Sequence, residues 1–232
     1  MSVRYAVPPI VTNGLVLYLD AANRQSYVSG STTWFDATAN GLSGSLVNGP
    51  TFSSANGGSI VFDGVNDYVV VESSSIFTFG TSNFTFNWWE NPSSTFTTTF
   101  RTFGNIPNRQ WATNDWVIGQ SNTTTFQFYV NNYNTSSPMF QTTITPSIWQ
   151  NITITRSGNT WTLYINSVSP IASVTSAVSL DGGNQRPFYI GSSGILSEFW
   201  KGNIASTQIY NRALSAQEVL QNYNSTKARF GL

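Results

Sequence analysis

The sequence predicts an all-β protein, built as a sandwich or barrel, with one short helix near its C-terminus. Three observations lead to this prediction. Most apolar runs alternate apolar and polar residues with a period of two, the pattern of strands that bury one face. A helix start signal stands at Ser215. Turn-forming Asn-Gly pairs begin at Asn13, Asn40, Asn48 and Asn56.

The expected strands follow from this alternation. In one run Ile152 and Ile154 share a face, and the next run begins after Ser157-Gly158-Asn159, a tight hairpin connection. In chain order the expected strands cover residues 15–19, 60–62, 68–71, 84–88, 126–130, 151–155, 160–166, 188–190 and 204–210. Many short strands with frequent turn signals are typical of a β-sandwich or a barrel.

The helix is expected over residues 215–224. The Ser215 side chain can accept a hydrogen bond from the backbone N–H of Glu218, and Glu218 can reach back to Ser215. Leu214 can pack on Val219 as a hydrophobic staple. The segment therefore predicts a short capped helix directly after the last strand.

The 232 residues suffice for one substantial domain, and no second domain is needed. We expect an extended, Pro-containing arm over residues 1–13, one sandwich domain over residues 14–226 and a tail over residues 227–232.

Charge and composition exclude several function classes. Ten Lys and Arg balance ten Asp and Glu, so no basic face is available for nucleic acid. The absence of Cys and His excludes disulfides, thiolate nucleophiles, a Ser-His-Asp triad and His-ligated zinc. No apolar run approaches the roughly 18 residues that span a bilayer, and the N-terminus lacks the apolar part of a signal peptide. We expect neither a nucleic acid partner nor membrane insertion. We expect the protein to be synthesised in a cytoplasm.

Four segments carry a family resemblance: GLVLYLDAAN (14–23), SIVFDGVNDYVVV (59–71), WQNITITRSGNTWTLYINSV (149–168) and FWKGNIASTQIYNRALSAQEVLQNY (199–223). Together they resemble a laminin G-like domain of the concanavalin A-like lectin/glucanase superfamily, of the type found in phage virion proteins. The resemblance implies a two-sheet antiparallel jelly roll. Asn66 stands where the family has the first acidic residue of an Asp-Asp pair, which weakens the transfer of a metal site more than that of the fold.

Catalysis is not expected. Glucanases of this superfamily use a Glu-x-Asp-x-x-Glu strand, since retaining hydrolysis needs two carboxylates roughly 5 Å apart. Glu72, Glu90, Glu198 and Glu218 have no acidic neighbour at this spacing. We therefore predict no enzymatic activity, no catalytic residue and no resident cofactor.

The resemblance makes calcium the candidate metal for this chain. Relatives often hold Ca²⁺ at a sandwich edge, and Asp63 and Asp67 are the candidate ligands here. In the competing interpretation, Asp63 caps the turn at Gly64 and Asp67 starts the next strand. We favour this second interpretation, because Ca²⁺ needs about six or more oxygen ligands and the segment offers few charges.

Glycan binding needs aromatic faces beside polar side chains. Residues 100–135 contain both, and the candidates for ligand or partner contact there are Trp111, Trp116, Tyr129 and Tyr133. Trp89 is a further candidate: if Trp88 faces inward, Trp89 points outward, and an exposed Trp marks contact with a partner. The competing interpretation assigns the large aromatic residues to the core.

Both chain ends are candidates for assembly. Tyr5, Ile10 and Phe230 would be buried on a neighbouring molecule, and fraying of both ends is the alternative.

The predicted function is that of a non-enzymatic virion structural protein, a phage capsid decoration or accessory surface protein, made in the host cytoplasm. Its partners would be capsid or other virion proteins and further copies of itself. The alternative is a carbohydrate-binding or receptor-binding, lectin-like module of a tail fibre or secreted protein, with cell-surface glycans as partners. Both functions rest on analogy of fold.

Overall fold

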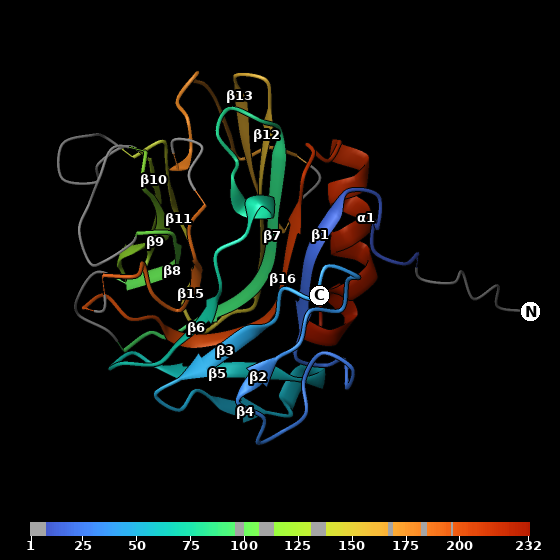
Figure 1. Cartoon of the computed structure of the whole chain (residues 1–232), viewed down its shortest axis with the longest axis vertical. Helices are drawn as coiled ribbons and strands as arrows, with labels where there is room; N and C mark the ends of the chain where they lie inside the picture. Colours follow the sequence, from blue (N-terminus) through green and yellow to red (C-terminus); the bar gives the residue numbers. More distant parts are fainter. Residues whose placement is uncertain are drawn as a thin grey trace, which may run out of the picture.

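Two antiparallel β-sheets face each other, which confirms the all-β sandwich (Figure 1). The computed structural model describes residues 8–95, 100–106, 114–130, 138–166, 169–181, 185–195 and 197–232. Within these residues each sheet has eight strands. The 3₁₀ turns η1 (Ala55–Gly57), η2 (Ser75–Phe77) and η5 (Lys227–Phe230) lie outside the sheets.

Sheet A has the strand order β14-β13-β12-β7-β16-β5-β4, with β1 paired to β16 off this path. The pairing of β1 with β16 runs from Leu15 opposite Tyr210 to Asp20 opposite Ser206, so it joins the two ends of the domain. The strands of sheet A are β1 (Leu15–Asp20), β4 (Thr51–Ser53), β5 (Ser59–Asp63), β7 (Phe84–Pro92), β12 (Gln150–Ser157), β13 (Thr160–Ile165), β14 (Ala172–Thr175) and β16 (Lys201–Tyr210).

Sheet B has the strand order β11-β10-β9-β8-β15-β6-β3-β2. Its strands are β2 (Thr33–Trp34), β3 (Gly44–Val47), β6 (Tyr68–Val71), β8 (Phe100–Gly104), β9 (Trp116–Asn122), β10 (Thr125–Val130), β11 (Phe140–Thr143) and β15 (Phe188–Ile190).

All nine expected strands are confirmed. The strands that alternation does not predict include β2 and β11 at the two edges of sheet B, and β4 and β14 at the two edges of sheet A. β2 and β4 have only two and three residues, too few to show a period, and β11 has a single buried residue.

Strand β7 shows how the core is built. Phe84, Phe86 and Trp88 point into the sandwich and are at most 3% exposed. The Phe86 ring stacks on Trp116 at 5.1 Å between centroids, and the Trp88 ring meets Phe103 edge-on at 5.1 Å. Because these partners belong to sheet B, the inward rings of β7 join the two sheets.

The inward face of β7 also carries a buried carboxyl group, that of Glu90. Glu90 is fully buried, and Trp88 Nε1 donates a 2.8 Å hydrogen bond to its Oε2. Burial strips water from the carboxylate and raises the pKa of Glu90 from its ordinary value of 4.5 to about 7, although the hydrogen bond from Trp88 opposes this shift.

The helix α1 (Ala216–Thr226) begins with the expected capping box. Glu218 N donates to Ser215 Oγ at 3.3 Å, and Ser215 N donates to Glu218 Oε2 at 2.9 Å. Arg212 forms an ion pair with Glu218 at 2.6 Å, and this guanidinium lowers the pKa of the carboxyl to about 2. No helix in the described residues is long and apolar enough to cross a membrane.

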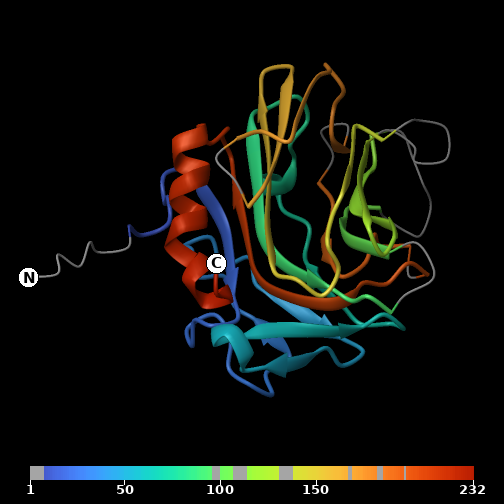
Figure 2. The same cartoon turned by 180° about the vertical axis from the view of Figure 1, so that it is seen from behind.

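The helix packs against sheet A beside β1 and β16, as Figure 2 shows from behind. Beneath it lies a polar layer rather than a purely apolar one. Asn222 Nδ2 donates to Tyr210 Oη at 2.9 Å, and Asn87 Nδ2 donates to Thr153 Oγ1 at 2.6 Å, while Asn151 Nδ2 donates to the Trp88 carbonyl at 3.0 Å. Hydrogen bonding satisfies these buried groups, and the bond between Asn222 and Tyr210 joins the helix to β16.

The chain from residue 8 onward also packs on this helix. Val11 N donates to Asn222 Oδ1 at 2.8 Å, and Gln221 Nε2 donates to the Pro9 carbonyl at 2.8 Å. The expected arm over residues 1–13 therefore lies, in its described part, against its own domain.

The C-terminal segment gives two corrections. Trp89 does point outward from sheet A, but it is only 1% exposed, because Phe230 of η5 stacks on it at 4.1 Å and Tyr223 at 5.8 Å. The expectation that Trp89 is exposed is therefore wrong. Phe230, expected at an assembly contact, is 9% exposed and buried within its own chain.

Replacing the buried carboxyl by an amide should change how stability depends on pH. The folded-state pKa of Glu90 lies above the unfolded value, so the unfolded chain loses the proton first between pH 4.5 and 7. The free energy of unfolding of the native protein then falls by about 3 kcal/mol across this range and levels off above it. In Glu90→Gln this fall should be absent in urea titrations at pH 4.5 to 8. Exposed Glu72→Gln is the control, and parallel curves for Glu90→Gln and the native protein would contradict the prediction.

Removing the ring that covers Trp89 should destabilise the domain. We expect Phe230→Ala to lower the free energy of unfolding by about 3 kcal/mol, with a red shift of tryptophan emission as water reaches Trp89. Leu232→Ala is the control, since Leu232 is 46% exposed two residues further on and should cost less than about 0.5 kcal/mol. If both variants lowered the free energy of unfolding equally and only slightly, the Phe230 ring would not stabilise the domain by covering Trp89.

Candidate functional site

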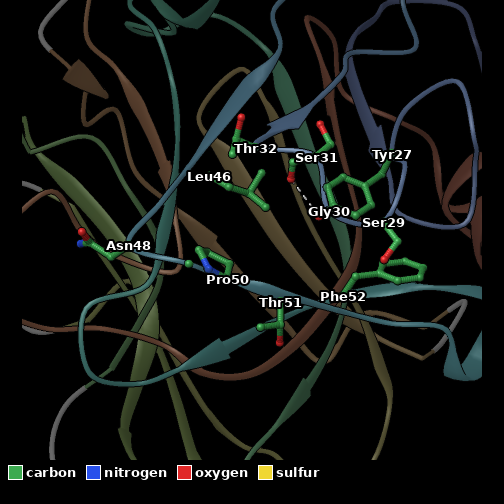
Figure 3. A pocket seen from close by; sticks show the side chains of 11 residues that line it. Tyr27, Ser29, Gly30, Ser31, Thr32, Leu46, Asn48, Pro50, Thr51 and Phe52 are labelled. Carbon is green, nitrogen blue, oxygen red and sulfur yellow. Dashed lines mark hydrogen bonds between the residues drawn. The ribbon is translucent and has the colours of Figure 1, made fainter.

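The candidate site is a hollow at the open edge of the sandwich, where sheet A ends at β4 and sheet B ends at β3 and β2. It has a volume of about 470 Å³. Its walls come from the loop before β2, from β3, from the turn at residues 48–50 and from β4 (Figure 3). This volume falls within the range of small-molecule sites, roughly 300–1,000 Å³.

The apolar part of the hollow is an aromatic pair with two aliphatic neighbours. The rings of Tyr27 and Phe52 lie 5.4 Å apart at an interplanar angle of 31°. Tyr27 is 4% exposed, whereas Phe52 is only partly buried. Leu46 and Pro50 lie across from this pair (Figure 3).

The polar part of the hollow carries hydroxyl and amide groups. No Asp, Glu, Lys or Arg is among the residues that line it, all of which the structure describes; its polar side chains are Ser29, Ser31, Thr32, Asn48 and Thr51.

Local hydrogen bonds shape these walls. Tyr27 Oη donates to the Ser31 carbonyl at 3.0 Å, which closes the loop before β2. Asn48 has a φ of +67°, a left-handed conformation that Asn tolerates, and its Nδ2 donates to the Asn66 carbonyl at 2.8 Å. The Asn-Gly pair therefore makes the turn that forms one end of the hollow.

A second hollow of about 510 Å³ adjoins the first and shares Tyr27, Ser29 and Phe52 with it. Its other lining residues are Ala21, Ala22, Arg24, Val28, Ser54 and Gly57. We call the two hollows together the edge groove, with the Tyr27–Phe52 pair at their junction.

The wall of the second hollow is tied to the C-terminus. Arg229 forms an ion pair with Asp20 at 3.0 Å, and its Nη2 donates to the Gly58 carbonyl at 3.2 Å. Asn56 Nδ2 donates to the Arg229 carbonyl at 3.0 Å, and Trp149 Nε1 donates to Asn56 Oδ1 at 3.1 Å. These bonds hold the loop after β1 next to η1.

The aromatic residues expected to contact a ligand lie elsewhere. Trp116 is 1% exposed in the core between the sheets, so its ring offers no face to a ligand. Tyr129 is 8% exposed and packs in a small cluster with Ile106 and Val117. Trp111 and Tyr133 lie outside the described residues.

Of the residues expected at an assembly contact, Tyr5 lies outside the described residues and Ile10 is partly buried. Trp89 and Phe230 cover each other, as described above.

The two calcium candidates bind backbone groups of their own turn. Asp63 Oδ1 accepts from Val65 N at 2.7 Å, and Asp67 Oδ2 accepts from Asp63 N at 3.1 Å. Burial raises the pKa of Asp67, and the neighbouring Asp63 carboxylate adds to this shift. In the described part of the chain no group of three or more His, Cys, Asp or Glu side chains could hold a metal ion. Calcium binding stays a prediction.

The edge groove was not predicted from the sequence. The Asn48-Gly49 pair did indicate a turn, but the strands that flank it, β3 and β4, have no two-residue alternation, and Tyr27 lies in a loop. Only the pairing of both sheets brings these segments together.

Solved structures confirm the fold. Trypanosoma rangeli sialidase in complex with 2,3-difluorosialic acid matches with a TM-score of 0.70 and 15% identity over 95% of this chain and 34% of the sialidase chain. The binding domain of Paraclostridial Mosquitocidal Protein 1 matches with a TM-score of 0.68 and 20% identity over 91% of this chain and 52% of that one. The chain thus spans about a third and about half of these two proteins.

A third solved structure is covered almost completely. Domain 4 of AbnA, a GH43 extracellular arabinanase from Geobacillus stearothermophilus, in complex with arabinotriose, matches with a TM-score of 0.65 and 16% identity over 90% of this chain and 98% of that domain. At these identities the likeness concerns the fold.

Among curated proteins, none matches this sequence. The family comparison does give a match, to the Laminin_G_3 family, described as the Concanavalin A-like lectin/glucanases superfamily, over residues 63–220. The match covers more than half of the chain and includes the strands at the centre of both sheets. The chain therefore belongs to the concanavalin A-like lectin/glucanases superfamily.

Proposed function

We propose that this protein is a carbohydrate-binding module and that the edge groove is its binding site. The observation that carries the proposal is the composition of the first hollow, which combines the partly buried Phe52 with uncharged hydroxyl and amide groups. A sugar ring has an apolar face that stacks on an aromatic ring and hydroxyls that exchange hydrogen bonds with polar side chains.

Structural neighbours support the same class of ligand. The AbnA domain holds arabinotriose, and the sialidase structure holds a sialic acid derivative. The mosquitocidal protein match is named a binding domain. This support is analogy of fold, so the residues of the groove carry the argument.

The module binds without catalysis in this proposal. Neither hollow has an Asp or Glu among its lining residues, and the sequence contains no His or Cys. Glycoside hydrolysis needs a pair of carboxyl groups beside the sugar, so the groove has no means of cleaving what it binds.

Two variants should remove binding on a glycan microarray and in calorimetric titration with the glycans it identifies. Phe52→Ala deletes the stacking ring, and Thr32→Trp fills the first hollow from its exposed rim while leaving the core intact. We expect each to weaken binding by about tenfold or more. Phe35→Ala is the matched control, because Phe35 is 47% exposed and lies outside both hollows. Unchanged affinity in Phe52→Ala and Thr32→Trp would place the binding site elsewhere.

A second candidate function is that of a virion structural protein, exposed on the particle surface and bound to capsid proteins or to further copies of itself. The low charge of the chain and its exposed apolar side chains, among them Val65 at 69% and Ile171 at 50%, favour burial of this surface in an assembly. Glycan binding and display on a virion are compatible.

Mass spectrometry of particles purified on a density gradient tests this second function. We expect the protein to co-purify with the capsid protein at a fixed ratio that repeated banding does not change. Loss of the protein from banded particles, while the capsid protein remains, would exclude the structural role.

A further inference from the structure

Arg24 differs from the other residues of the edge groove. It lines the second hollow and is the one charged side chain among the lining residues of both hollows. The residue is exposed and belongs to the wall of this hollow.

Arg24 also differs from the other described cations of this charge-poor chain. Each of the other Lys and Arg side chains in the described residues has a partner within the chain. Arg101, Arg186, Arg212 and Arg229 form ion pairs, Arg156 and Lys201 donate to backbone carbonyls, and Lys227 lies over the Tyr223 ring.

The positive charge of Arg24 is not neutralised by a neighbour. All ten acidic residues lie in the described part of the chain, and none of them pairs with Arg24. Asp20, at the end of β1 beside this loop, is occupied by Arg229, Tyr18 and the backbone of Ala22. A cation in a hollow with no acidic partner is positioned to receive an anionic group from a ligand.

We propose that the second hollow binds an acidic sugar unit, with Arg24 contacting its carboxylate or sulfate group, while the first hollow holds an adjoining uncharged part of the same saccharide. This inference rests on the proposed function and assigns the class of glycan. The two hollows meet at the Tyr27–Phe52 pair, so a single chain of sugar units can occupy both.

The test compares saccharides that differ only in charge. Calorimetric titrations use trigalacturonate against its methyl-esterified form for the carboxylate, and 3′-sulfolactose against lactose for the sulfate. We expect at least one acidic member to bind about fivefold to tenfold more tightly than its neutral counterpart, since a hydrogen bond between charged groups exceeds a neutral one by that amount. The preference should shrink in 1 M NaCl, which screens exposed charges.

Arg24→Gln should abolish the acidic preference, because the affinity for the acidic member falls by about fivefold to tenfold. Lys201→Gln is the matched control, because it removes one positive charge outside the edge groove and should keep the preference. An equal loss in both variants would mean that net charge attracts the ligand, and it would overturn the role of Arg24.

Failure of this inference differs from failure of the proposed function. Equal binding of acidic and neutral members, abolished by Thr32→Trp, would overturn the acidic subsite and leave carbohydrate binding in the groove intact. No binding of any glycan on the array by the native protein would overturn both.

Discussion

The two-residue alternation of strand β7 is the constraint on which the rest of the structure depends. Its inward residues, Phe84, Phe86 and Trp88, fill the space between the sheets. On its outward face, Trp89 contacts Tyr223 and Thr226 of the C-terminal helix and Phe230 of η5. Because successive side chains of a strand point to opposite faces, a shift of β7 by one residue would exchange the core with the helix-binding surface. The register of one central strand therefore positions both layers.

Most of the sandwich could be predicted from the sequence, because buried strands such as β12 and β13 need alternation and the helix cap needs Ser215 and Glu218 at fixed spacing. The environment of Trp89 could not be predicted, since alternation gives the direction of a side chain and says nothing of what covers it. Phe230, 141 positions later, covers it only after β7 and β16 pair. The groove escaped prediction for a similar reason: Tyr27 and Phe52 meet across the edges of two sheets, where no periodic pattern is required.

The edge of the sandwich has irregular backbone turns and open space for a ligand, and its centre has neither. Between the sheets, aromatic rings close the space and leave no room for a ligand. At β2 and β4 the sheets end, so backbone turns and small polar side chains take the place of rings and leave hollows. The ion pair of Arg229 with Asp20 then stiffens one wall from outside. A rigid scaffold with irregular segments at its rim is a common arrangement for binding sites.

The pairing of β1 with β16 has a consequence for how the chain folds. Residues 15–20 form their ladder with residues 206–210, so this pairing needs almost the whole chain to be available. A strand synthesised early waits for a partner synthesised late, and until then β1 and the facing edge of β16 lack their hydrogen bonds. Contacts of such long sequence separation place folding in the roughly millisecond-to-second range of β-sandwiches. In a growing polypeptide the sandwich would close only after β16 has left the ribosome, and the unpaired strands would be open to aggregation until that moment.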